Sequence, residues 1–178
     1  GEAAHAGTTP MPLRDDALVK AAPVFTLLPE WVRERNPDMV GTIGRVELFP
    51  GATNVVPGRC RFVAEVRSQK TEDMLHLREV LQGYAAGRAG WRVETILEKD
   101  GTPLAEHLIH AVAEAAGQEG LSCVRMPSGA GHDAQSFAAA GVPTGMIFVP
   151  CRRGMSHSPD EWIEPAQAAQ GCQVLLRT

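Results

Sequence analysis

The first hundred residues alternate between helical and strand-like patterns of hydrophobic positions. Apolar residues recur near helical spacing over residues 14–36, which predicts a helix that Pro23 and Pro29 must kink or split. Residues 39–49 and 59–67 then alternate between apolar and polar positions, the pattern of strands with one packed face. A helix followed by two strands is therefore expected.

A second helix and a further strand follow in the same part of the chain. Thr71 is predicted to cap the helix, and Gly90 is predicted to stop it. Residues 91–99 alternate again, and a short strand is expected before Thr8. This order fits an antiparallel four-stranded sheet with two helices, an α+β arrangement over residues 1–100.

After residue 100 the pattern changes to helices and short apolar runs. Thr102 is predicted to cap a helix, and apolar runs at residues 123–126 and 144–150 each lead through a loop to another helix. The last helix is expected to open at the capping box Ser158-Pro-Asp-Glu161. Residues 101–178 are therefore expected to form part of an α/β domain with parallel strands, which makes the fold class of the whole chain α/β.

Composition and charge narrow the classes of partner. The 178 residues carry 17 Lys and Arg against 21 Asp and Glu, a formal net charge of −4. Because the chain also lacks a basic run, a large nucleic-acid-binding surface is not expected. No apolar run reaches the length of a membrane span, and the first ten residues lack the features of a signal peptide. We therefore expect neither nucleic acid nor a membrane as a partner.

The cysteines indicate the cellular compartment of the protein, and the first residue indicates whether the sequence is part of a longer chain. Four cysteines lie far apart and form no CxxC pair, so they are expected to be reduced thiols in the cytoplasm. The chain does not begin with Met, and its first residues lead directly into a motif. We therefore expect it to be a piece of a longer protein.

Three of the six histidines are candidates for chemistry. His5, His132 and His157 each lie in a loop rich in Gly, Ser, Thr or Pro, whereas the other three fall inside predicted helices. Each histidine alone is compatible with a structural role. Together they suggest a metal site or an acyl-transfer site, because neutral imidazole binds zinc and protonated imidazole stabilises an oxyanion. His132 and His157 also follow predicted strands, at the sheet edge where α/β domains bind ligands.

Other motifs leave alternatives open. Residues 128–133 precede a predicted helix and could hold an anion, but they lack the spacing of phosphate-binding and dinucleotide-binding loops. No Gly-x-Ser-x-Gly sequence supports a serine hydrolase. By default Asn54 is a turn residue and Arg67 a solvated strand residue. The functional alternative for Arg67 is recognition of a substrate carboxylate through two parallel hydrogen bonds.

Four motifs, taken in order, resemble a known family. They are His5-Ala-Gly-Thr-Thr-Pro-Met11, Thr53-Asn54-Val-Val-Pro-Gly58, Ser128-Gly-Ala-Gly-His132-Asp133-Ala and Ser156-His157-Ser-Pro-Asp-Glu161. Together they resemble the hydantoinase/carbamoylase amidases, a branch of the zinc aminopeptidase-like superfamily. That branch includes N-carbamoyl-L-amino acid hydrolases, allantoate amidohydrolases and bacterial β-ureidopropionases. The resemblance implies that residues 1–100 form the family's lid, which also dimerises, and that residues 101–178 form the C-terminal part of its catalytic domain.

The resemblance also implies roles for single residues. His157 would be one ligand of a site for two divalent metal ions, zinc or manganese, with cobalt and nickel as alternatives. His5 would enter the partner subunit's site and stabilise the developing oxyanion, while Asn54 and Arg67 would hold the substrate's carboxylate. Substrate contacts are implied for His5, Asn54, Arg67, Gly131 and His132. A site of this kind needs a homodimer formed through the lid.

The implied activity is metal-assisted hydrolysis of a ureido or amide C–N bond, in an N-carbamoyl amino acid or in allantoate. The family's other metal ligands and its general-base glutamate lie in an N-terminal segment that this chain lacks, so the 178 residues alone are expected to be inactive. Two alternatives are a non-catalytic homodimerising module and an aminoacylase or dipeptidase-type metallopeptidase. The motif at residues 5–11, together with the Gly-His-Asp run, favours the carbamoylase branch.

Overall fold

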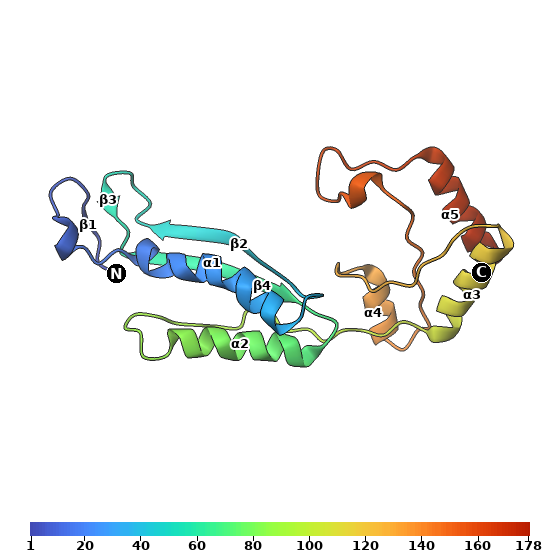
Figure 1. The fold of residues 1–178 in the computed structure, drawn as a ribbon, viewed down its shortest axis with the longest axis horizontal. Helices are drawn as coiled ribbons and strands as arrows, with labels where there is room; N and C mark the ends of the chain where they lie inside the picture. Colours follow the sequence, from blue (N-terminus) through green and yellow to red (C-terminus); the bar gives the residue numbers. More distant parts are fainter. The chain divides into compact units, whose positions relative to one another are not determined.

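The computed structural model describes residues 1–178 and divides them into two compact units, Gly1–Gly101 and Thr102–Thr178. Unit 1 contains all the strands and two long helices, and unit 2 contains three helices joined by loops (Figure 1). No helix is both long enough and apolar enough to cross a membrane. The chain is therefore mixed α and β, with all of its sheet structure in unit 1.

Unit 1 is built on two separate antiparallel strand pairs. The short strand β1 (Ala4–His5) pairs with β3 (Val55–Val56), and β2 (Val40–Phe49) pairs with β4 (Arg59–Arg67). Both long strands and the short first strand lie where the alternating pattern predicts them. The expected four-stranded sheet does not form, because the first strand pairs outside the hairpin of β2 and β4.

Residues 91–99, the expected fourth strand, form no strand. An alternating sequence becomes a strand only where its backbone finds a partner, and these residues instead make side-chain contacts to α2 (Thr71–Ala85). Arg78 Nη1 donates to Glu98 Oε2 at 2.6 Å, and the ring of Trp91 lies edge-on to Tyr84. The segment is therefore attached to a helix rather than to the sheet.

The bounds of α2 differ from those expected. Thr71 is the first residue of the helix rather than its cap; the capping position belongs to Lys70, which makes no side-chain capping bond. The helix ends at Ala85, before the predicted stop at Gly90. Gly87 and Gly90 have φ of 75° and 79°, so the chain turns twice through a conformation that favours glycine.

The hairpin of β2 and β4 has one apolar face and one charged face. Ile43 lies opposite Ala64 on the face that packs against α1 (Ala17–Arg35) and α2, and Glu47 lies opposite Arg61 on the other face. The buried core under the apolar face consists of Leu28, Val32, Met39 and Leu77. The charged face therefore remains available for polar contacts.

Helix α1 continues through both of its prolines, so of the two expected outcomes, a kink or a split, the split does not occur. The helix begins after Asp16, whose side chain accepts hydrogen bonds from Leu18 N and Val19 N at 2.8 and 3.2 Å. Pro23 and Pro29 are both exposed, so the carbonyls left without a helical partner lie near solvent. The opposite, packed side of the helix carries the buried residues Ala21, Val24, Leu28 and Val32.

Unit 2 lacks the predicted parallel strands. It contains α3 (Glu106–Gln118), α4 (Asp133–Ala139) and α5 (Pro165–Arg177), with a small core of Ala115, Ala116 and Val174 between α3 and α5. The apolar runs at residues 123–126 and 144–150 form no strand and do not pair with each other. Because strands exist only as paired ladders, an apolar run without a partner stays irregular.

Two helices in unit 2 begin later than predicted. Helix α3 begins at Glu106, well after Thr102, and α5 begins at Pro165. A turn forms at the expected capping box without its reciprocal bonds, since Glu161 Oε2 accepts from His157 N at 3.0 Å and Ser158 Oγ accepts from Asp160 N at 3.2 Å. The following chain cannot continue it as a helix, because Glu164 precedes a proline and is extended.

Candidate functional site

The structure brings His5 and Asn54 side by side at one end of unit 1. His5 pairs with Val55 across the β1–β3 ladder, and the backbone N–H of Ala6 donates to the Asn54 carbonyl at 2.8 Å. Both side chains are exposed. The pairing of two very short strands therefore unites two candidate residues that lie far apart in the sequence.

The His5 ring is held by its own loop. Its Nδ1 accepts hydrogen bonds from the backbone N–H groups of Gly7 and Thr8, at 3.0 and 3.2 Å. Arg14 closes the same loop, because its Nε donates to the Thr9 carbonyl at 3.0 Å and its Nη2 donates to the Ala6 carbonyl at 2.5 Å. The histidine is exposed but has a defined orientation.

Arg67 lies at the opposite end of unit 1. It is the last residue of β4, whereas the first residues of the chain lie near the start of that strand. Gly58, the residue before β4, is so close to Ala3 that a Cβ added to the glycine would lie 2.8 Å from Ala3 N. The eight residue steps from Arg59 to Arg67 span about 26 Å at the usual rise of a strand. One copy of the chain therefore does not bring Arg67 to His5 and Asn54. In Figure 1, β1 and β3 lie together at one end of the pair of β2 and β4.

The Arg67 side chain is exposed and pairs with Glu65 on the same face of β4. Its Nε and Nη2 both donate to Glu65 Oε1, at 2.8 and 2.6 Å. Both bonds end on one oxygen, so the guanidinium pairs with Glu65 without forming the two parallel bonds of a bidentate carboxylate contact. A substrate carboxylate that binds there would replace Glu65 or share the arginine with it.

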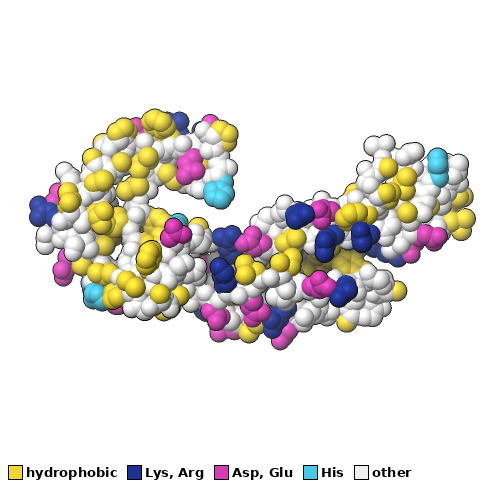
Figure 2. Space-filling model, turned by 180° about the vertical axis from the view of Figure 1, so that it is seen from behind, with side chains coloured by type: hydrophobic (Ala, Val, Ile, Leu, Met, Phe, Trp, Pro, Cys, Tyr) yellow, Lys and Arg dark blue, Asp and Glu magenta, His cyan; other side chains and the backbone are white.

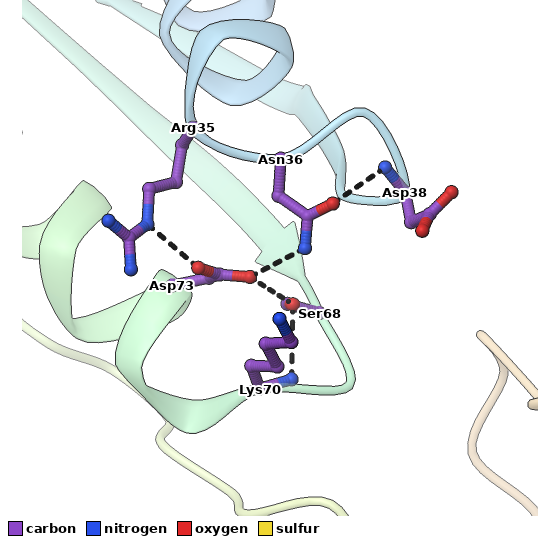
Figure 3. Close-up of polar contacts among 6 residues, drawn as sticks. All are labelled: Arg35, Asn36, Asp38, Ser68, Lys70 and Asp73. Carbon is purple, nitrogen blue, oxygen red and sulfur yellow. Dashed lines mark hydrogen bonds and ion pairs between the residues drawn. The ribbon is translucent and has the colours of Figure 1, made fainter.

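Asp73 is a buried carboxylate that the sequence analysis did not identify as a candidate. It accepts hydrogen bonds from Asn36 Nδ2, Ser68 Oγ and Arg35 Nε, at 2.8, 2.9 and 2.7 Å (Figure 3). The bond from Asn36, then those from Ser68 and Arg35, lower the pKa of Asp73 against the opposing effect of burial. These bonds join the end of α1 and the end of β4 to α2, next to Arg67. A polar pocket of about 500 Å³ adjoins this cluster.

His132 and Gly131 lie together in the loop before α4. His132 Nε2 lies 3.0 Å from Ser128 Oγ, and its ring lies 5.7 Å from the ring of Phe148. Gly131 is exposed, and a Cβ on it would meet no atom within 4 Å. This loop is therefore open to a ligand, although the sheet edge expected to hold it does not form.

His157 is exposed and has a positive φ of 56°. Within the structure no three His, Cys, Asp or Glu side chains gather into a group that could hold a metal ion. A catalytic zinc usually has three protein ligands, so the residues of this chain alone do not form such a site. His157 is therefore exposed enough to bind a metal ion but does not belong to a complete ligand set within this chain.

Charge on unit 1 is mixed rather than uniformly basic. Figure 2 shows Lys and Arg side chains interspersed with Asp and Glu side chains over the face of unit 1 in view. Arg45 Nη2 pairs with Glu47 Oε1 at 2.5 Å, and the Arg59 guanidinium lies 4.1 Å from the centre of the Phe49 ring. Such a surface fits small anionic groups at single arginines better than a long polyanion.

Comparison with known proteins identifies the family. The model of peptidase family M20/M25/M40 matches residues 4–178. The chain belongs to this family. Its M20 relatives include an N-carbamoyl-L-amino-acid amidohydrolase of Paenarthrobacter aurescens, 38% identical over 99% of this chain and 44% of that protein. An allantoate amidohydrolase of Bacillus subtilis is 33% identical over 98% of this chain and 43% of that protein.

Solved structures of M20 relatives support the same family assignment. A hydantoinase/carbamoylase family amidase of Burkholderia vietnamiensis matches with a TM-score of 0.87 and 35% identity, over 99% of this chain and 44% of that one. A structure described as an amidohydrolase/peptidase of Burkholderia cenocepacia matches with a TM-score of 0.81 and 42% identity, with the same coverage. The resemblance seen in the motifs is thus confirmed. The chain spans less than half the length of these relatives.

Proposed function

We propose that this chain is the lid and the C-terminal catalytic portion of an amidohydrolase that cleaves the ureido or amide C–N bond of an N-carbamoyl amino acid or of allantoate. Relatives that carry these activities in their names match 98% or more of the chain. The observation that carries the proposal is the juxtaposition of His5 with Asn54, two motif residues united by the β1–β3 pairing. Each belongs to a motif that resembles the carbamoylase branch.

The proposed substrate contacts divide into two groups. His5 donates a hydrogen bond to the oxygen that gains charge during hydrolysis, and Asn54 lies beside it to orient the substrate. Arg67 binds the substrate carboxylate through two parallel hydrogen bonds, in place of the two bonds that now end on Glu65 Oε1. Gly131 and His132, in the loop before α4, are the substrate contacts proposed from unit 2.

Divalent metal ions are part of the proposal, because the M20 family is generally metal-dependent. Such ions would polarise the scissile carbonyl and acidify a bound water. His157 is the ligand proposed from this chain, and zinc, manganese, cobalt and nickel all suit a site of mixed nitrogen and oxygen ligands. Since these residues alone do not gather a metal site, we propose that the 178-residue chain is inactive by itself. Turnover of N-carbamoyl amino acids by the purified chain would contradict this.

A homodimer formed through the lid completes the proposed site. The length of β4 separates Arg67 from His5 and Asn54 within one protomer, so one small substrate cannot contact all three. Two copies related by a twofold axis can bring the His5 end of one lid to the Arg67 end of the other. The single site therefore takes His5 and Asn54 from one copy and Arg67 from the other.

Mixing two impaired variants of the full-length protein tests this arrangement, with the substrate kept well below the native KM so that a raised KM also lowers the rate. After subunit exchange between His5→Ala and Arg67→Ala, half of the dimers are mixed, and each mixed dimer has one intact site. We therefore expect recovery of about a quarter of the native activity on an N-carbamoyl amino acid. No recovery, with exchange shown by native mass spectrometry, would overturn the shared site. A native protein that hydrolyses dipeptides but neither carbamoyl amino acids nor allantoate would overturn the proposed substrate class.

A further inference from the structure

We propose that Arg14 is a positioning residue for His5, and that the loop around it fixes His5 as the tautomer whose proton is on Nε2. This inference rests on the proposed role of His5 as a hydrogen-bond donor to substrate. Arg14 touches no proposed substrate atom. It acts through the loop of residues 5–9.

The tautomer follows from the partners of the ring. A backbone N–H can only donate, and the amides of Gly7 and Thr8 both point at His5 Nδ1, at 3.0 and 3.2 Å. Nδ1 must therefore present its lone pair, and the proton of the neutral ring must be on Nε2. His5 thus offers a hydrogen-bond donor, rather than an acceptor, at Nε2.

Arg14 holds the loop that supplies these amides. Its guanidinium donates to the carbonyls of Ala6 and Thr9, which lie on either side of Gly7 and Thr8. A planar guanidinium reaches two carbonyls with two fixed N–H directions, whereas a lysine ammonium has no such fork. The loop also closes on itself, since Thr9 N donates to the His5 carbonyl at 3.1 Å.

Gly7 leaves the space that the ring occupies. A Cβ at this position would lie 3.2 Å from His5 Cε1 and 3.4 Å from Nδ1. A methyl group there would press on the ring where Nδ1 receives its amide bonds. The loop therefore requires a small residue next to the histidine for a reason of packing.

Imidazole nitrogen NMR of the full-length protein, labelled with ¹⁵N only in histidine, tests the tautomer directly. His5→Gln assigns the His5 signals by their disappearance. In the native protein we expect the correlation pattern of a neutral ring protonated at Nε2. In Arg14→Lys we expect signals of both neutral tautomers. A ring protonated at Nδ1 in the native protein would overturn the proposal, as would a pattern unchanged in Arg14→Lys.

Kinetics separate positioning from a general loss of folding. Arg14→Lys is expected to lower kcat for an N-carbamoyl amino acid about tenfold with little change in KM, because the donor acts mainly in the transition state. In a His5→Ala background the same substitution should have no further effect, since its only route is through that ring. Arg33→Lys, an exposed arginine of α1, is the matched control and should retain native activity. Equal losses in both backgrounds would overturn the proposal.

The two measurements also distinguish this inference from the proposed function. If the native protein has no amidohydrolase activity, the proposed function fails while the NMR result still decides the tautomer and the role of Arg14 in fixing it. If activity is present but the NMR pattern is that of the other tautomer, only the present inference fails.

Discussion

Asp73 and Arg35 form an ion pair of 2.7 Å that joins the first turn of α2 to the last turn of α1. The Asp73 side chain is only 4% exposed, so the charge is taken out of water and depends on its partners. The same carboxylate accepts hydrogen bonds from Ser68, the residue after Arg67, and from Asn36 (Figure 3). Asn36 in turn accepts, through its Oδ1, a hydrogen bond from the N–H of Asp38 in the turn before β2. One buried side chain therefore fixes both turns that flank the Arg67 end of the hairpin.

Replacing this carboxylate should weaken the fold in a pH-dependent way. The pKa of Asp73 in the folded chain is lowered by the hydrogen bonds from Asn36, then Ser68 and Arg35, relative to an unfolded value of about 3.9. A lowered folded-state pKa means stabilisation at neutral pH that is lost as the pH falls through that pKa. We expect Asp73→Asn to unfold at lower urea concentration near pH 7. The difference from the native chain should shrink below about pH 4.

Circular dichroism during urea unfolding, at a series of pH values, measures this difference. Glu72→Gln removes a charge from the neighbouring position in the same first turn, but its side chain is exposed. That control should change the unfolding midpoint little at any pH. An Asp73→Asn effect of equal size at neutral and acidic pH would show that the ionised carboxylate is not what stabilises these turns.

Local sequence patterns predict the elements of unit 1 well. The alternation at residues 59–67 coincides with β4, and the helical spacing over residues 14–36 contains α1. What fails is pairing, which depends on residues distant in the sequence. Apolar and polar positions alternate in residues 91–99 as regularly as in β4, yet this segment contacts α2 and forms no strand. The two residues of β1, by contrast, pair with β3. Alternation indicates which face is apolar but not which neighbour a strand obtains.

The candidate site also divides into features that local sequence predicts and features that depend on the pairing of distant residues. Motifs single out His5 and Asn54, and the family resemblance adds Arg67. Only the strand register reveals that the first two meet and that Arg67 lies at the far end of the hairpin. An acidic residue in the first turn of a helix, such as Asp73, is favourable there whether or not it is buried, so no motif marks it. A signal was present: Asp73 precedes Leu77 by four positions and so shares its buried face.

Loss of the Arg67 guanidinium should mainly weaken substrate binding. In the full-length protein, Arg67→Ala is expected to raise KM for an N-carbamoyl amino acid by about tenfold or more, with a smaller change in kcat, because a bidentate carboxylate contact is removed. Arg61→Ala, on the same strand and the same face, is the matched control. Steady-state kinetics with a carbamoyl amine that lacks the carboxylate should show no effect of Arg67→Ala. An unchanged KM for the carboxylate substrate would contradict the assignment.

Metal content distinguishes what this chain binds alone from what it contributes to a larger site. His157 is exposed and belongs to no group of three potential ligands, whereas a tightly held catalytic zinc usually needs three protein ligands. Elemental mass spectrometry after exhaustive dialysis of the 178-residue chain should therefore find far less than one zinc or manganese ion per chain. The full-length protein should retain metal, and His157→Ala should lower its content while His110→Ala, an exposed histidine of α3, should not. An ion that survives dialysis of the 178 residues alone would mean that ligands within this chain complete the site around His157.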